Sequence, residues 1–261
     1  MSTGSVVEIN GIKIGMINYT YNTAEYNDGR VALNGIPVPA EYAQMINTFN
    51  YSHLDSFYEK LAGEMEDMYR DGAEAIVLYI HWGDEYRIVE NATQRKMAQQ
   101  LCNLGIDVIV GNHAHVPQPV SLLTSENDDS QKTLCLYSTG NAVSNIYKTT
   151  KFPVNTEDGM LFTFTFAKYT DGTVLVESVN VIPTWVYRYD ENYVRKFRVL
   201  YMDDALEDSQ SLMNLSDSVL RKCEASYERT MGIVGAGIEE ANQYYAANQS
   251  AVEAALEAAW Q

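Results

Sequence analysis

The chain has 261 residues, of which 46% are hydrophobic and 20% are charged, and its formal net charge is −17. This composition predicts a folded protein with a hydrophobic core, in one large domain or one domain with an appendage. The charge excludes nucleic acid and anionic lipid from the expected partners, because both are polyanions. No apolar run is long enough to cross a bilayer, and we expect no signal peptide in the first residues, which have neither a basic nor an apolar segment.

The first part of the chain predicts a hairpin, an irregular segment and a helix. Asn10-Gly11 lies between the short β-type runs VVEI and IKIG, which is a strong signal for a tight hairpin turn. Residues 21–50 are rich in Asn, Tyr, Gly and Pro, and they predict irregular structure with a short helix after Pro39. Apolar residues at helical spacing then predict a helix over 54–72.

The middle of the chain predicts a βαβ unit. Residues 74–80 and 106–110 are continuous apolar runs, as expected for strands buried on both faces. Between them, residues 92–104 have helical spacing and stop at Gly105. Because a strand, a helix and a strand with short links form a parallel pair, the carboxyl ends of both strands should lie at one edge of the sheet.

The remaining chain predicts more strands and then helices. Residues 133–137 form a third predicted strand, and 159–169 and 173–182 alternate as a second hairpin around Asp171-Gly172.

From about Met202 to the end the pattern is helical, and Gly232, Gly235 and Gly237 predict a division into two helices. The expected fold class is therefore α/β, a mixed sheet packed by helices with a helical C-terminal appendage from near residue 200. The odd number of cysteines predicts free thiols, with Cys102 and Cys135 buried.

Three of the four histidines follow predicted strands of the βαβ unit. His81 follows the first strand, and His113 and His115 follow the second, so all three reach the same sheet edge. In an extended stretch, alternate residues point to one side, so His113 and His115 should aim together. Three imidazoles suit a divalent metal such as zinc, manganese or iron. The alternative is that each is a capped or solvated residue, as we expect for His53.

Neighbouring polar residues are weaker candidates. Asp84 and Glu85 could orient an imidazole or act as general acid and base, or they could simply solvate the loop. Asn141 follows the third strand and reaches the same edge if that strand is parallel; its alternative role is turn formation. Trp82 could wall the site or lie in the core, and Gln118 is the weakest candidate.

Three blocks together resemble the CapA family of poly-γ-glutamate capsule biosynthesis proteins, which is similar to the calcineurin-like metallophosphoesterases. They are HWGDEY (81–86), VIVGNHAHVPQPV (108–120) and LYSTGN (136–141). The resemblance covers roughly residues 6–185. It implies a four-layer α/β/β/α sandwich and a two-metal site, with the positions of His81, His113 and His115 as ligands.

The sequence departs from that family in two respects. Ala142 stands where the family has an aromatic residue, and the family's first half, with its Gly-Asp and Asn-Asn-His blocks, has no counterpart. We therefore expect residues 1–200 to be the C-terminal part of a CapA-like domain and 201–261 to be its helical appendage. Because the first half supplies the aspartates and the bridging carboxylate, this polypeptide alone is expected to be a poor hydrolase or none.

Three functions follow as hypotheses. The first is the metal-binding half of a CapA-like enzyme of capsule or other cell-surface polymer biosynthesis, at the cell surface and membrane-attached in full length. Its expected partners are an anionic polymer or its phosphorylated precursor and a missing N-terminal half, with two metals in the full-length protein. The second is a non-catalytic module that binds polymer or partner on the same fold. The third is a mononuclear zinc hydrolase with the three histidines as ligands and Glu85 as base. Asn141 is the expected substrate-binding residue.

Overall fold

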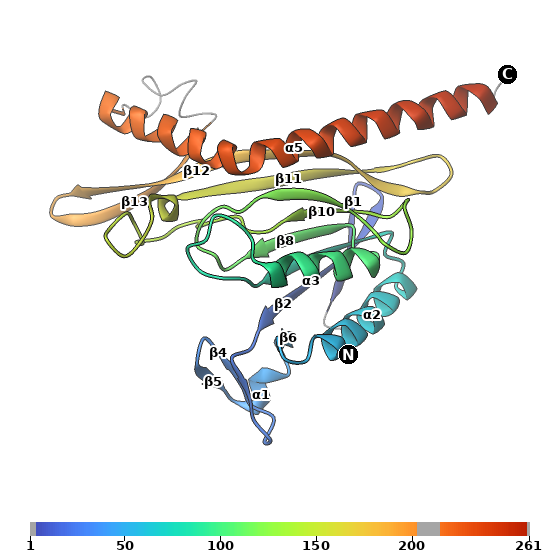
Figure 1. Ribbon diagram of the computed structural model, residues 1–261, viewed down its shortest axis with the longest axis horizontal. Coiled ribbons are helices and arrows are strands. Elements are labelled where there is room, and N and C mark those ends of the chain that lie inside the picture. Colours follow the sequence, from blue (N-terminus) through green and yellow to red (C-terminus); the bar gives the residue numbers. More distant parts are fainter. Residues whose placement is uncertain (1–3, 203–214, 260–261) are drawn as a thin grey trace.

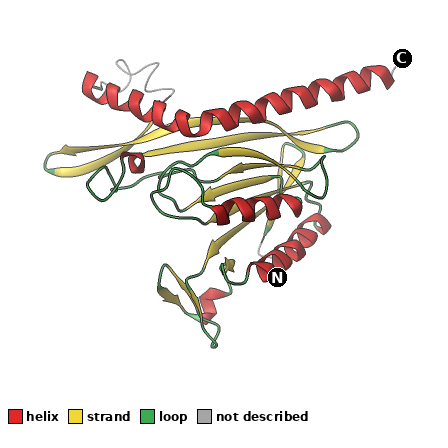
Figure 2. Cartoon of the chain, in the orientation of Figure 1, coloured by secondary structure: helices red, strands yellow, loops and turns green. Residues whose placement is uncertain are grey.

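The computed structural model describes residues 4–202 and 215–259 and is a mixed α/β structure (Figures 1 and 2). The strands of its central sheet are β1 (Ser5–Ile9), β2 (Ile12–Tyr21), β6 (Thr48–Phe49), β7 (Ala75–His81), β8 (Val108–Asn112), β9 (Val120–Thr124) and β10 (Lys132–Leu136). Their order is β1-β2-β7-β8-β10-β9, with β6 paired to β2. The four inner strands β2, β7, β8 and β10 run parallel.

The predicted hairpin and βαβ unit are both confirmed. In the hairpin, Ile9 lies opposite Ile12, and the turn residues Asn10 and Gly11 have φ of 51° and 84°. Two positive φ values are what a two-residue turn between antiparallel strands requires. Strands β7 and β8 are parallel, with Leu78 beside Ile109.

Two helices cover one face of the central sheet. They are α2 (Leu54–Arg70) and α3 (Ala92–Asn103), and both lie on the same side in Figure 1. Leu61 of α2 and Leu101 of α3 are fully buried, as are Ile76 and Leu78 of β7. Burying one such side chain stabilises the fold by roughly 1.5–3 kcal/mol. Val77 of β7 packs on the opposite face, so β7 is apolar on consecutive residues because both of its faces are buried.

A second sheet and a long helix lie on the opposite face (Figure 1). The sheet has the order β11 (Asp158–Lys168), β12 (Val174–Glu191) and β13 (Val194–Tyr201), and it follows the short 3-10 helix η1 (Val154–Glu157). The hairpin predicted around Asp171-Gly172 joins β11 to β12. Helix α5 (Asp217–Ala259) packs with both sheets, and its Val234 and Tyr245 share a core with Val108.

The tail differs from the prediction of two helices. Gly232, Gly235 and Gly237 lie inside the single helix α5, so the expected division is wrong. A Cβ atom on Gly237 would lie 1.9 Å from the carbonyl oxygen of Val120, so this glycine permits close helix–sheet contact instead of breaking the helix. The predicted helical start near Met202 falls next to residues 203–214, which lie outside the described residues. The domain boundary at residue 200 remains a prediction.

Residues 21–50 contain more structure than the sequence indicated. The short helix α1 (Ala40–Ala43) is present after Pro39, as predicted. A small sheet of β3 (Ala24–Glu25), β4 (Val31–Leu33) and β5 (Ile36–Val38) precedes it. Strands of two or three residues are too short for alternation to reveal them.

The prediction for the cysteines agrees with the structure. All three cysteines are buried free thiols. Across the described ranges, no helix combines the length and apolar character needed to span a membrane.

A buried ion pair fastens α5 to the start of β11. The carboxylate of Asp158 is fully buried. It accepts hydrogen bonds from Nε of Arg229 at 2.8 Å and from the hydroxyl of Ser226 at 2.6 Å. The charge is therefore satisfied within the protein, as a buried carboxylate must be. No sequence pattern indicated this pair, because its members are far apart in the chain.

We expect Arg229→Met to destabilise the protein by about 3–5 kcal/mol, because it leaves the Asp158 carboxylate buried without a counter-charge. Urea unfolding followed by circular dichroism measures this change. The matched control is Arg195→Met, which breaks the exposed pair of Arg195 with Asp190 and should change the midpoint little. Equal midpoints for the two variants would contradict this role of Arg229.

Candidate metal centre

The structure brings His81, His113 and His115 together at the carboxyl edge of the central sheet. His81 ends β7, and His113 and His115 follow β8. The ring centroids of His81 and His113 are 4.6 Å apart, and those of His113 and His115 are 6.3 Å apart. All three line one cavity of about 260 Å³ together with Glu85. His53 is elsewhere, with its side chain 65% exposed.

The two histidines after β8 converge by a route that the sequence did not predict. His113 has φ of 105° and His115 has φ of 58°, so the expected extended backbone is wrong. Non-glycine residues seldom adopt such values, and they cluster at functional sites where the surroundings impose them. Here the amide of Tyr86 donates to the carbonyl of Ala114 at 2.7 Å and ties the two loops together.

Asn141 fixes the tautomer of His115. The Asn141 amide nitrogen donates to the carbonyl oxygens of His115 and Thr156, both at 3.0 Å. Its Oδ1 must therefore be the acceptor from Nδ1 of His115, at 2.9 Å. Nε2 of His115 then carries no proton, and its lone pair can bind a metal ion. Asn141 thus reaches the predicted edge, and its polar atoms are engaged with the protein; its role toward a substrate remains a prediction.

Tyr21 is a site residue that the sequence reading missed. Its hydroxyl lies 3.1 Å from Nε2 of His113. Desolvation, followed by the charges of Glu85 and Asp84, raises the pKa of Tyr21, so the hydroxyl stays protonated and shares a hydrogen bond with Nε2 of His113. The missed signal was topological: β2 is parallel to β7, so Tyr21 at its end reaches the same edge as His81.

The imidazoles of His81 and His113 are held in their neutral form. Desolvation of the ring, together with the nearby His113 and His115, lowers the pKa of His81 to about 4. Desolvation is also the main cause that lowers the pKa of His113. A neutral imidazole is the form that coordinates a metal ion.

The acidic neighbours of His81 lie in different places. Glu85 lines the cavity, and its Oε1 is 3.9 Å from Nε2 of His115. The carboxylate of Asp84 instead accepts from the side chain of Asn91 at 2.8 Å. Trp82 is fully buried in the core and donates from Nε1 to the carbonyl of Tyr137 at 3.0 Å. Glu85 is therefore the one acidic candidate of this loop that faces the histidines.

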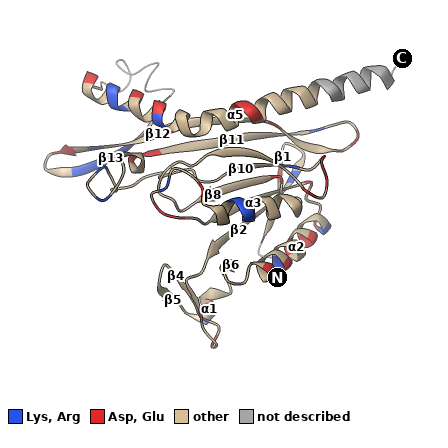
Figure 3. Cartoon of the chain, in the orientation of Figure 1, with Lys and Arg blue, Asp and Glu red and all other residues tan. Residues whose placement is uncertain are grey.

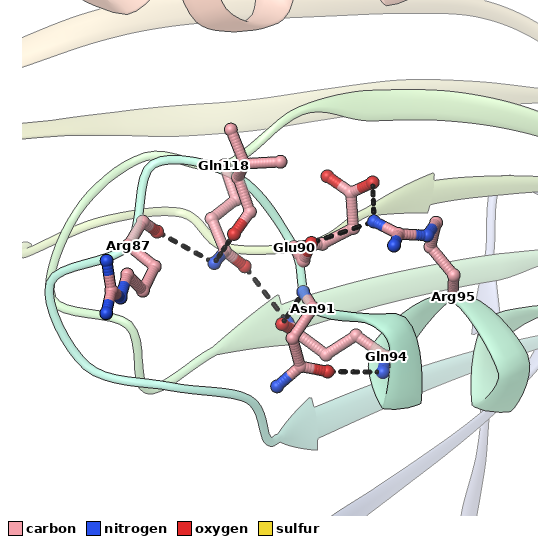
Figure 4. Close-up of polar contacts among 7 residues, drawn as sticks. Arg87, Glu90, Asn91, Gln94, Arg95 and Gln118 are labelled. Carbon is pink, nitrogen blue, oxygen red and sulfur yellow. Dashed lines mark hydrogen bonds and ion pairs between the residues drawn. The ribbon is translucent and has the colours of Figure 1, made fainter.

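Gln118 holds the loops that carry the site (Figure 4). This residue is fully buried, donates to the carbonyl of Arg87 at 2.8 Å and accepts from Gln94 at 3.0 Å. Gln94 and Asn91 form a reciprocal capping box at the start of α3. Gln118 therefore joins the loop after β8 to the loop after β7.

The chemistry of this donor set fits a divalent metal. Three imidazole nitrogens and one carboxylate are ligands that zinc, manganese and iron accept. Within the described part of the chain, however, no three His, Cys, Asp or Glu side chains are already placed to hold one ion. Binding would require the rings to rotate and the hydroxyl of Tyr21 to release Nε2 of His113.

Comparison with known proteins connects these residues to a family. The model of the family described as "Bacterial capsule synthesis protein PGA_cap" matches residues 2–146, more than half of the chain. "PGA biosynthesis protein CapA" of Bacillus subtilis (strain 168) is 37% identical over 71 residues, which are 27% of this chain and 17% of that protein. "Capsule biosynthesis protein CapA" of Bacillus anthracis is 31% identical over 84 residues, 32% of this chain and 19% of that protein. The matched segments span less than a fifth of either relative.

The position of Asn141 predicts that His115 carries its proton on Nδ1. Long-range ¹H–¹⁵N correlation spectra distinguish the two tautomers, and we expect the Nδ1-protonated form in the unmodified protein. Asn141→Leu should give a mixture, because the acceptor is gone; Asn145→Leu is the control outside the cavity. An Nε2-protonated His115 in the unmodified protein would show that this assignment is wrong.

Proposed function

Because this chain belongs to the bacterial capsule synthesis protein PGA_cap family, we propose that it acts in the assembly of a capsular or other cell-surface polymer as a metal-binding protein. The observation that carries this proposal is the shared cavity of His81, His113, His115 and Glu85. The three imidazoles would hold a divalent ion of manganese, iron or zinc. The proposed location is the cell surface.

Each residue has a distinct part in the proposed chemistry. A bound ion would act as a Lewis acid and lower the pKa of a water molecule. Asn141 keeps the Nδ1 proton of His115 in place, so that Nε2 is available to the ion. Oε1 of Glu85, at the mouth of the same cavity, is the group that would accept a proton from water or from a substrate hydroxyl.

The proposed reaction class is metal-dependent phosphoester hydrolysis on a four-layer α/β/β/α sandwich. Helices α2 and α3, the central sheet, the second sheet and α5 are the elements that would form these layers. An anionic polymer or its phosphorylated precursor would be the substrate. Glu85 is the one carboxylate lining the cavity among the described residues. We therefore propose that this chain alone is a poor hydrolase or none, and that a partner polypeptide supplies the further carboxylates of a two-metal centre.

One observation favours a second function. Nε2 of His113 already has a hydrogen-bond partner in Tyr21, and this contact competes with a metal ion. A module that binds polymer or a partner without catalysis needs no such ion. A measurement of metal binding therefore distinguishes the two proposed functions.

After removal of metal by a chelator, we expect calorimetric titration with Mn²⁺ or Zn²⁺ to show about one ion per chain, because three imidazoles form one ligand set. His113→Ala should weaken binding by more than the roughly 10–100-fold that loss of an outer hydrogen-bond partner causes, and Asn141→Ala should fall within that range. His53→Ala is the matched control and should bind as the unmodified protein does.

Two results would contradict parts of this proposal. Absence of binding to the unmodified protein would reject the metal centre and favour the non-catalytic module. Two tightly bound ions with phosphodiesterase turnover would contradict the proposal that this chain alone is inactive.

A further inference from the structure

The second sheet covers the central sheet unevenly. Val108 of β8 is fully buried, whereas Val7 and Ile9 of β1 are 41% and 44% exposed. Tyr79 of β7 is 41% exposed. The register pairs Val7 with Ile14, which packs against the second sheet, so β1 presents these apolar side chains on the same face. The second sheet therefore leaves the β1 side of the central sheet uncovered.

A groove lies where this coverage ends. Ile9, Met16 and Tyr79 form its floor on β1, β2 and β7, and Phe164 and Phe166 of β11 form its wall. Its volume is about 330 Å³. We call it the open groove. A contiguous apolar surface of this kind on a soluble fold is typical of an interaction site.

The wall of the open groove is an edge strand. Among the described residues, β11 pairs along its length with β12 alone, apart from a bridge between Gly140 and Gly159 at its start. Its other edge therefore has backbone groups available for a further strand. Lys168 at the far end of β11 is paired with Glu74 at 2.5 Å.

The two edges of the second sheet differ in charge. Proteins commonly protect exposed edges with charged side chains. β13, the opposite edge, carries Arg195, Lys196 and Arg198. Residues 159–167 of β11 include no charged residue, and Figure 3 shows most of β11 without charge colour. The β13 edge is protected, and the β11 edge is suited to pairing.

The topology argues against a second copy of this chain as the occupant. Strands β2 and β1 continue the central sheet beyond the groove wall. Each strand adds about 4.8 Å of width. If two copies paired through their β11 edges, strands β1 and β2 of one copy would occupy the same space as those of the other. An isolated extended segment meets no such obstacle.

We propose that the open groove receives an extended strand from a partner polypeptide, which pairs with the free edge of β11 and lays apolar residues at alternate positions on Met16 and Tyr79. Strand addition of this type combines main-chain hydrogen bonds with side-chain pockets. A second cavity shares Tyr79 with the groove and is also lined by His81 of the candidate metal centre. Binding of the added strand requires no metal.

The test selects peptides that bind the metal-free protein from a random phage-displayed library. Each peptide is long enough to span β11. We expect enriched peptides to have apolar residues at alternate positions and to slow hydrogen exchange of amides in 161–168. The double variant Ile9→Lys with Tyr79→Lys in the groove floor should weaken binding at least about tenfold, a loss of about 1.4 kcal/mol. Both positions are already partly exposed, and circular dichroism checks that the variant folds.

The matched control is the double variant Val194→Lys with Tyr193→Lys. Both residues are exposed at the turn between β12 and β13, away from the open groove. This variant should leave peptide binding unchanged. Three results would overturn the proposal: no enriched peptide, equal binding to the floor variant, or self-association in sedimentation that Tyr79→Lys abolishes, which would make a second copy the occupant.

Discussion

Parallel pairing of β7 with β2 on one side and β8 on the other is the constraint on which the candidate site depends. The ladder sets Thr20 beside His81 and His81 beside Asn112. Tyr21, His81 and His113 therefore leave the sheet at one edge. A slip of one residue would turn every side chain of a strand to the opposite face. Buried Ile76 and Leu78 against the helices prevent that slip.

Close packing behind the edge limits how the loop after β8 can move. A Cβ atom on Gly111 would lie 2.1 Å from the carbonyl oxygen of Tyr137 and 2.6 Å from Nε1 of Trp82. The same indole nitrogen donates to that carbonyl. β8, β10 and the loop after β7 thus meet at a glycine, and the histidines project from a rigid support. This packing fixes the backbone of the site, and only the side chains have to rotate before the rings can share one ion.

The sequence predicted the features that follow from hydrophobic periodicity and from the order of elements along the chain. It missed the features that depend on contacts between distant segments. Continuous apolar runs and a helix between them were sufficient to place His81, His113 and His115 at one edge. The left-handed backbone of His113 was not predictable, because hydrogen bonds from a separate loop impose it. Tyr21 was missed because the parallel pairing of its strand with β7 was not inferred. The glycines inside α5 resembled helix breakers in the sequence. Gly237 instead allows α5 to approach Val120 closely.

We propose that imidazoles from two strand ends share one ion, and X-ray absorption spectroscopy of protein loaded with one equivalent of Zn²⁺ tests this arrangement most directly. We expect a first shell with three nitrogen ligands at about 2.0–2.1 Å and the multiple scattering of imidazole rings. A first shell of oxygen atoms alone, without imidazole scattering, would contradict it.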